Sequence, residues 1–248
     1  MIPTIRVFIA GNSGSGKTTG AWRWYMSRMP RVLVIDQIGE WEERVDFATN
    51  SLGDVVTTMQ MLRNQSKWTI AYSLSDGRFV DLVRWLIPRP NVEGSPSIAV
   101  GGMTLVIDEA DLLAPTGAPE EVRTLYRRSR HVGLSIISAT QRPANVSREV
   151  SAQSTHVLAY RLREPRDRDY IADLMRWDSA QITQWVAWTQ VHPHGAAWKD
   201  LQEGRELWIP ETGQPQDRSS PSAPLPVHDD AESKQSPPPS PESQDQQT

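Results

Sequence analysis

Runs of continuous apolar residues alternate with amphipathic segments along most of the chain. The runs are short and rich in β-branched residues, as in strands buried on both faces, and the segments between them have helical spacing. The expected strands are Ile5–Ala10, Arg31–Asp36, Trp68–Ser73, Met103–Asp108, Gly133–Ala139 and Thr155–Tyr160. The expected helices are Lys17–Met29, Asp54–Arg63, Phe79–Leu86, Pro119–Arg130, Asp167–Arg176 and Ser179–Ala187. This alternation predicts an α/β fold whose mainly parallel central sheet is flanked by helices.

Residues 211–248 have a different composition. They hold eight of the 19 prolines, seven acidic and two basic residues, and few apolar side chains. Such a segment cannot bury enough apolar surface to offset the entropy lost on ordering, so we expect a disordered acidic tail rich in Pro, Ser and Gln. Residues 1–210 then form the folded part, with a tryptophan-rich extension at 176–210. Core or subunit contacts are the expected role of these tryptophans, and stacking on nucleic acid is the alternative.

The composition excludes several classes of function. The chain has no cysteine, which excludes a disulfide framework, thiol catalysis and cysteine-based zinc sites. No apolar run reaches the roughly 18 residues that a transmembrane helix needs, so we expect no membrane span and a cytoplasmic location. The net charge of −4 is concentrated in the tail, and therefore neither excludes a nucleic-acid partner nor argues for one.

The strongest motif runs from Gly11 to Thr18 and satisfies G-x-x-x-x-G-K-[ST] between an expected strand and an expected helix. Its glycines let the backbone wrap around a polyphosphate, and the helix N-terminus adds a partial positive charge. Lys17 should reach the β- and γ-phosphates of ATP, and Thr18 should bind Mg²⁺. The expected cofactor-binding residues are Gly11, Asn12, Ser13, Gly14, Ser15, Gly16, Lys17, Thr18 and Thr19.

A second candidate element is the buried strand that ends in Asp108 and Glu109. Beside a phosphate loop, an acidic pair in this position is typical of a Walker B element. Asp108 is then the second expected Mg²⁺ ligand, and Glu109 the base that polarises the attacking water. Asp111 is an alternative base. The structural alternative is a strand that ends in a solvated acidic turn.

Two further segments resemble a known family. The strand that ends in Ala-Thr-Gln141-Arg-Pro143, with Arg130 shortly before it, is similar to the fourth strand of the FtsK–HerA superfamily of DNA-pumping ATPases. Asp36-Gln-Ile-Gly-Glu40-Trp41 resembles the stretch after the second strand in the HerA-like branch of that superfamily. The resemblance covers about residues 4–175. It implies a RecA-like sheet with strand order 5-1-4-3-2 and a ring of identical subunits, a hexamer or pentamer.

The same resemblance implies roles for individual residues. Gln141 would be the polar sensor near the γ-phosphate and the attacking water, and Arg130 an arginine finger that enters the neighbouring subunit's site. Arg127 is the alternative finger, because it shares a helix face with Arg130; a solvated basic face is the structural alternative. Glu40 would assist near the metal or simply end a strand.

The implied function is an ATP-hydrolysing translocase of double-stranded DNA, similar to the genome-packaging ATPases of membrane-containing (tectivirus-like) viruses. Capsid vertex or viral membrane proteins are further expected partners, and the host cytoplasm or the virion is the expected location. A filamentous-virus extrusion ATPase, a HerA-like DNA-processing motor and a P-loop kinase are the alternatives; Glu109 and Gln141 count against the kinase. The loop Pro88–Gly102 would line the pore of a ring or be an ordinary surface loop.

Overall fold

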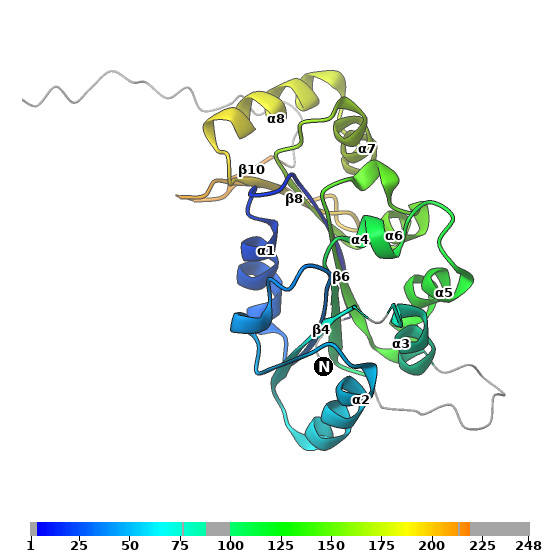
Figure 1. Cartoon of the computed structure of the whole chain (residues 1–248). Helices are drawn as coiled ribbons and strands as arrows, with labels where there is room; N and C mark the ends of the chain where they lie inside the picture. Colours follow the sequence, from blue (N-terminus) through cyan, green and yellow to red (C-terminus); the bar gives the residue numbers. More distant parts are fainter. Residues whose placement is uncertain (1–3, 76, 88–99, 213, 219–248) are drawn as a thin grey trace, which may run out of the picture.

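The computed structural model describes residues 4–75, 77–87, 100–212 and 214–218, and its core is one ten-stranded sheet (Figure 1). The strand order across the sheet is β10-β9-β8-β7-β1-β6-β5-β2-β4-β3. The strands are β1 (Arg6–Ala10), β2 (Arg31–Asp36), β3 (Phe47–Thr49), β4 (Trp68–Ser73), β5 (Met103–Ile107), β6 (Ser135–Thr140), β7 (His156–Tyr160), β8 (Ala196–Asp200), β9 (Glu206–Ile209) and β10 (Gln216–Asp217).

Eight α-helices are found in the described ranges. They are α1 (Lys17–Gly20), α2 (Leu52–Met61), α3 (Phe79–Leu86), α4 (Ala110–Leu113), α5 (Glu120–Arg128), α6 (Arg148–Ala152), α7 (Pro165–Met175) and α8 (Ser179–Val191). Helix α1 continues through a π-helical turn, Ala21–Tyr25, and a 3₁₀ turn, Met26–Arg28, so the helical segment expected after the glycine-rich loop is present with mixed hydrogen bonding. In Figure 1 it lies on one side of the sheet, and helices α3 to α6 lie on the other.

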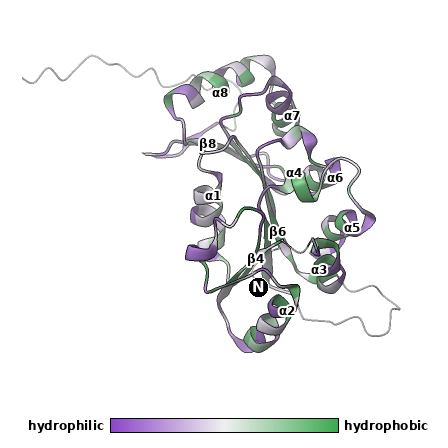
Figure 2. Ribbon diagram, in the orientation of Figure 1, coloured by the Kyte–Doolittle hydropathy of each residue, from purple (hydrophilic) through white to green (hydrophobic). Residues whose placement is uncertain are grey.

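The core divides into two layers because successive strand residues point to opposite faces of the sheet. On β1, Phe8 belongs to the core layer that also holds the buried side chains of α2, α3, α5, α7 and α8, whereas Val7 and Ile9 belong to the layer that holds those of the helical segment starting at α1. Figure 2 shows the matching pattern on the helices, where α2, α5 and α8 carry both hydrophobic and hydrophilic residues. The strands are continuously apolar because both of their faces are buried, and the helices are amphipathic because only one of theirs is.

The expected mainly parallel sheet is confirmed, but its strand order differs from the prediction because the sheet has ten strands and not five. The five strands of that prediction are adjacent as β7-β1-β6-β5-β2 and run parallel. Parallel strands β4 and β3 extend one edge, and the antiparallel strands β8, β9 and β10 extend the other. Pairing with β8 covers the edge of β7 that a five-strand sheet would leave open.

The tryptophan-rich segment belongs to the core of this extension. Trp177, Trp185, Trp188 and Trp208 are buried and their rings contact one another. The indole nitrogens of Trp177 and Trp208 both donate hydrogen bonds to the Glu206 carboxylate. A core role therefore holds for these four tryptophans.

The expected boundary of the disordered tail at residue 211 is wrong by a few residues. Gln216 and Asp217 form β10, which pairs with β9. The guanidinium carbon of the buried Arg218 lies 4.6 Å from the Trp208 ring centroid, and its Nη2 donates a 2.8 Å hydrogen bond to Gln184. Backbone pairing and this cation–π contact order a segment that has almost no apolar residues of its own.

Two expectations lie outside the described residues. They concern the tail beyond residue 218 and most of the loop Pro88–Gly102. Within the described ranges, no helix is long and apolar enough to cross a bilayer.

Candidate functional site

The carboxyl ends of the parallel strands meet at one edge of the sheet, where open α/β folds place their ligands. The segments that follow β1, β2, β5 and β6 line a cavity of about 630 Å³ there. The lining residues are Ser13, Gly14, Gly16, Lys17, Thr18, Thr19, Gly20, Arg23, Trp24, Ile38, Glu40, Asp108, Glu109, Gln141, Tyr160, His194, Ala196, Ile209, Pro210 and Glu211.

The conformation of the glycine-rich loop is fixed by its own backbone angles and by hydrogen bonds to neighbouring strands. The amide of Gly11 donates to the carbonyl of Thr140, and the amide of Asn12 to that of Arg161, which anchors the loop to β6 and to the end of β7. Gly14 and Gly16 have φ angles of +70° and +99°, a region that favours glycine. The Lys17 ammonium donates a 3.0 Å hydrogen bond to the Asn12 carbonyl, which links the end of the loop to its beginning.

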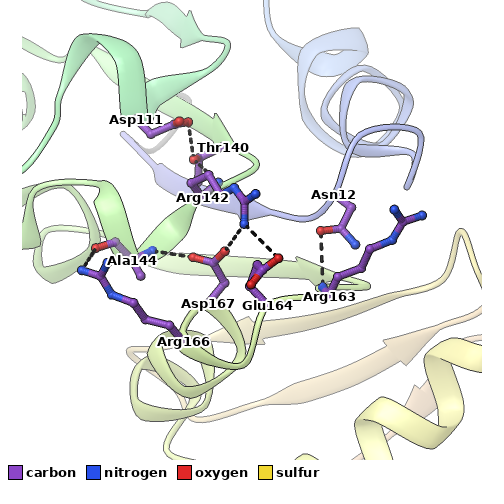
Figure 3. A network of polar contacts seen from close by, with 9 residues as sticks. All are labelled: Asn12, Asp111, Thr140, Arg142, Ala144, Arg163, Glu164, Arg166 and Asp167. Carbon is purple, nitrogen blue, oxygen red and sulfur yellow. Dashed lines mark hydrogen bonds and ion pairs between the residues drawn. The ribbon is translucent and has the colours of Figure 1, made fainter.

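Six of the nine expected loop residues face the cavity, and three support it from behind. Ser13, Gly14, Gly16, Lys17, Thr18 and Thr19 line the cavity, whereas Gly11, Asn12 and Ser15 do not. The Asn12 side-chain oxygen accepts a hydrogen bond from the Arg163 amide, which ties the loop to the start of α7 (Figure 3). A Cβ at Gly11 would lie 2.5 Å from the Tyr160 Cβ, so only glycine fits between the loop and β7.

The Asp108 carboxylate is fixed by two hydrogen bonds. Its Oδ2 accepts a 3.0 Å hydrogen bond from the Trp41 indole nitrogen, and its Oδ1 accepts one from the Glu109 amide. Asp108 is 4% exposed and Trp41 is 1% exposed. Burial raises the pKa of Asp108, and the hydrogen bond from Trp41 opposes that rise.

Asp36 shapes the turn that delivers Trp41. Its Oδ1 accepts hydrogen bonds from the amides of Ile38, Gly39 and Glu40, and its Oδ2 accepts one from the Trp41 amide. This one carboxylate thus accepts hydrogen bonds from four backbone amides of the turn. The Asp-x-x-Gly-Glu-Trp stretch therefore connects the end of β2 to the acidic end of β5, and Glu40 lines the cavity.

Glu109 and Gln141 form a polar pair at the edge of the cavity. Gln141 Nε2 donates a 2.5 Å hydrogen bond to Glu109 Oε1. Glu109 has a φ of +54°, unusual for a residue other than glycine, and such backbone strain is often found at functional sites. Burial raises the pKa of the Glu109 carboxyl and lowers that of the Lys17 ammonium, while their opposite charges resist both shifts.

The structure places Asp111, the alternative base, outside the cavity lining. The Thr140 hydroxyl donates a 2.6 Å hydrogen bond to Asp111 Oδ1 and accepts one from the Arg142 amide (Figure 3). Asp167, which the sequence did not single out, accepts a hydrogen bond from the Ala144 amide and contacts the Arg142 guanidinium. These two carboxylates fix the segment after β6, which carries Gln141.

Arg130 does not lie in this cavity. It is exposed, in the 3₁₀ turn Ser129–Val132 that precedes β6, at the amino ends of the strands. Burial and the nearby charge of Arg130 lower the pKa of Arg6, which begins β1 at that same end. Arg127 pairs with Glu120 and Glu149, whereas the described residues provide no ion pair for Arg130.

The chain's oxygen donors fit a hydrated Mg²⁺ ion beside a bound phosphate. Thr18 and Asp108 both line the cavity, and a hydroxyl and a carboxylate are hard oxygen ligands. In the described part of the chain, no cluster of three or more His, Asp or Glu side chains could hold a metal by itself. Mg²⁺ usually keeps several waters and binds through one or two protein groups together with phosphates, so this sparse donor set suits it.

Sequence reasoning missed the residues at the far end of the cavity. Trp24, His194, Ile209 and Glu211 come from segments without a recognised motif. His194, Ile209 and Glu211 reach the glycine-rich loop only through pairing of β8 and β9 beside β7, which the sequence pattern did not reveal, whereas Trp24 lies in the helical segment that follows the loop. Trp41, which contacts Asp108 at the acidic end of the site, lies in a stretch whose resemblance the sequence did reveal.

A mainly parallel sheet with a glycine-rich loop between β1 and α1 is the fold of P-loop nucleoside triphosphatases. No protein-family profile and no curated protein matches the chain.

Solved structures do match it. The genome-packaging NTPase B204 of Sulfolobus turreted icosahedral virus 2, in complex with AMP, has a TM-score of 0.64 at 20% identity, over 86% of this chain and 100% of B204. The same enzyme with AMPPCP has a TM-score of 0.63 at 19% identity, over 84% and 98%. B204 of Sulfolobus turreted icosahedral virus has a TM-score of 0.61 at 16% identity, over 86% and 100%. The resemblance to packaging ATPases that the sequence suggested is confirmed in the fold.

Proposed function

We propose that this chain hydrolyses ATP and uses the energy to move double-stranded DNA, as the genome-packaging ATPase of a virus. The fold it shares with B204 supports the class of motor. The observation that carries the proposal is the Glu109–Gln141 pair, which faces the same cavity as Lys17.

Each residue has a role in hydrolysis. Lys17 and the loop amides bind the β- and γ-phosphates, and Thr18 and Asp108 would hold Mg²⁺. Bound Mg²⁺ would neutralise charge on these phosphates. Glu109 accepts a proton from the attacking water while the water oxygen bonds to the γ-phosphorus. The bond to the β–γ bridging oxygen breaks, and ADP and phosphate are released.

Gln141 keeps Glu109 in place for this step. Its amide donates to one carboxylate oxygen and leaves the other for the water. A carboxylate whose pKa is raised by burial is a better proton acceptor than a fully solvated one. A kinase would need instead to bring an acceptor hydroxyl to this position.

The proposed assembly is a ring, a hexamer or pentamer, in which Arg130 enters the neighbouring protomer's cavity. Its position at the opposite end of the sheet from its own cavity supports a role in trans. Double-stranded DNA would pass through the ring, gripped mainly by its backbone. Capsid vertex or viral membrane proteins are the proposed docking partners.

The test is ATP hydrolysis by the purified chain, with and without double-stranded DNA and with no phosphoryl acceptor. We expect turnover that DNA stimulates, and stimulation that weakens steeply as salt rises. Lys17→Ala should abolish turnover. Glu109→Gln should reduce it about 10²- to 10⁴-fold while ATP binding persists.

Glu42→Gln provides the matched control, because Glu42 is exposed and outside the cavity lining. It should leave turnover unchanged. If ATP is not hydrolysed in the absence of a phosphoryl acceptor, a kinase is favoured. Turnover that is indifferent to DNA would favour a motor that acts on another polymer, such as a virion subunit during extrusion.

A further inference from the structure

The cavity extends well beyond the glycine-rich loop, toward the antiparallel edge of the sheet. Its catalytic end is lined by residues that follow β2, β5 and β6. Its other end lies over β7, β8 and β9, on the opposite side of β1. Because strands are spaced about 4.8 Å apart, β9 lies about 14 Å from β1 across the sheet.

The strand register brings the end of β9 to the same edge as the loop. Tyr160, the last residue of β7, pairs with Ala196, and Ala196 pairs with Ile209. Since β8 is antiparallel to both neighbours, its first residue lies beside the last residues of β7 and β9. Pro210 and Glu211 follow directly and also line the cavity.

The turn between α8 and β8 lies against the loop itself. A Cβ at Gly16 would be 3.9 Å from the His194 Cβ. The neighbouring Gly195 packs tightly against Trp188, because a Cβ there would lie 2.5 Å from the Trp188 ring. The turn therefore places His194 beside the phosphate loop, and His194 lines the cavity.

The chemistry of this end is unlike that of a phosphate site. Ala196, Ile209 and Pro210 form an apolar floor, and Trp24 lines the cavity with them. Glu211 adds a carboxylate, whose Oε2 lies 3.3 Å from His192 Nδ1. His192 in turn packs its ring against Trp188, with centroids 4.7 Å apart. A carboxylate held in this way accepts hydrogen bonds and repels phosphate.

We propose that the end of the cavity formed by Trp24, His194, Ala196, Ile209, Pro210 and Glu211 binds the nucleoside part of the triphosphate. The inference rests on the proposed function, because it requires a triphosphate on Lys17. The apolar residues pack against the base, and Glu211 accepts hydrogen bonds from the ribose hydroxyls or the exocyclic amine of the base. The γ-phosphate then points toward Glu109, so the sheet order fixes the direction of the nucleotide.

This assignment gives the tryptophan-rich extension a role in binding. Its aromatic core holds β8, β9 and the α8–β8 turn in place, and these supply most of the nucleoside contacts.

The test compares binding of ATP with binding of inorganic tripolyphosphate, which has no nucleoside, by calorimetry on the full chain. Ile209→Ala and Glu211→Gln should each weaken ATP binding about tenfold and leave tripolyphosphate binding within about twofold. Glu211→Gln keeps the shape of the side chain, so it remains informative if Ile209→Ala unfolds the protein. Val191→Ala, at a 66% exposed position near the end of α8, should change neither affinity.

Lys17→Ala should weaken both ligands, which separates the two ends of the cavity. Unchanged ATP affinity in both cavity variants, or equal losses for ATP and tripolyphosphate, would overturn the nucleoside assignment while leaving the proposed function intact. A wild-type chain that binds neither ligand would overturn the proposed function and this inference with it.

Modified nucleotides then identify the group that Glu211 contacts. If the carboxylate binds the ribose, the loss caused by Glu211→Gln should disappear with 2′-deoxy-ATP. If it binds the exocyclic amine, the loss should disappear with inosine triphosphate, which lacks that amine. A loss that persists with both nucleotides would overturn the Glu211 contact.

Discussion

Asp108 shows how the environment of one side chain is built from distant parts of the sequence. It ends an apolar strand, yet the hydrogen bond to its Oδ2 comes from Trp41, 67 positions earlier. Trp41 reaches it because the Asp36 carboxylate holds the intervening turn. Asp36 and Trp41 thus form a supporting shell around a metal-ligand candidate, and such shells orient the ligands they contact.

Replacing Trp41 by Phe should weaken the dependence of nucleotide binding on Mg²⁺. The ring remains, but Asp108 Oδ2 loses its donor in a buried site. Loss of a supporting partner usually lowers metal affinity or activity 10- to 100-fold, so we expect the Mg²⁺ concentration for half-maximal ATP binding to rise by about that factor. Trp22→Phe, at a partly exposed position, is the control. An unchanged Mg²⁺ dependence would show that the indole only fills space.

At the scale of elements, the contact between the first helical segment and β7 depends on the absence of a side chain. Gly20 ends α1 directly against Tyr160, and a Cβ there would overlap the Tyr160 hydroxyl oxygen. Tyr160 is itself buried between this helix and the glycine-rich loop. The position of the phosphate loop is therefore coupled to the packing of Tyr160.

Gly20→Ala should lower the free energy of unfolding by about 1–3 kcal/mol, as overpacking of a core does. Chemical denaturation measures this change. Adding Tyr160→Phe should recover part of the loss, because it removes the overlapping oxygen. Gly53→Ala, inside α2, meets only the Ser51 hydroxyl at 3.6 Å and should be neutral or slightly stabilising. Equal effects at Gly20 and Gly53 would contradict the packing argument.

The elements that could be predicted from the sequence are those with a local signal. Continuous apolar runs identified β1, β2, β4, β5, β6 and β7, and the glycine-rich motif identified one end of the cavity. Strands β8 and β9 are short and mix apolar with charged residues, as in Ala196–Asp200, so periodicity did not reveal them. Ile209 and Glu211 join the cavity through strand register alone, which no local pattern encodes.

Truncation of the chain tests whether β10 and Arg218 contribute to stability. A chain that stops at Arg218 should unfold at the same temperature as the full chain, because the composition of residues 219–248 predicts no contribution to the core. A chain that stops at Pro210 should unfold at a lower temperature, since it loses the β10 pairing and the contacts of Arg218 with Trp208 and Gln184. Differential scanning calorimetry compares the three chains. Identical unfolding temperatures would show that β10 adds no stability.

At the scale of the whole molecule, the proposed catalytic groups lie at opposite ends of the sheet. Lys17, Glu109 and Gln141 lie at the carboxyl ends of the strands, whereas Arg130 precedes β6 at the amino ends. A single chain cannot bring Arg130 to its own cavity without taking the sheet apart. The arginine therefore acts on a second copy of the chain or has no part in the chemistry.

Mixing two inactive variants distinguishes these possibilities. Lys17→Ala leaves Arg130 intact beside a cavity that cannot hold phosphate, and Arg130→Ala leaves the cavity intact without a finger. If the finger acts in trans, an interface between the two variants contains one complete site, so the mixture should hydrolyse ATP although neither variant does so alone. A mixture of Lys17→Ala and Glu109→Gln, whose lesions fall in the same cavity, should stay inactive. Arg130→Ala with full activity alone, or no recovery in the first mixture, would contradict a finger at this position.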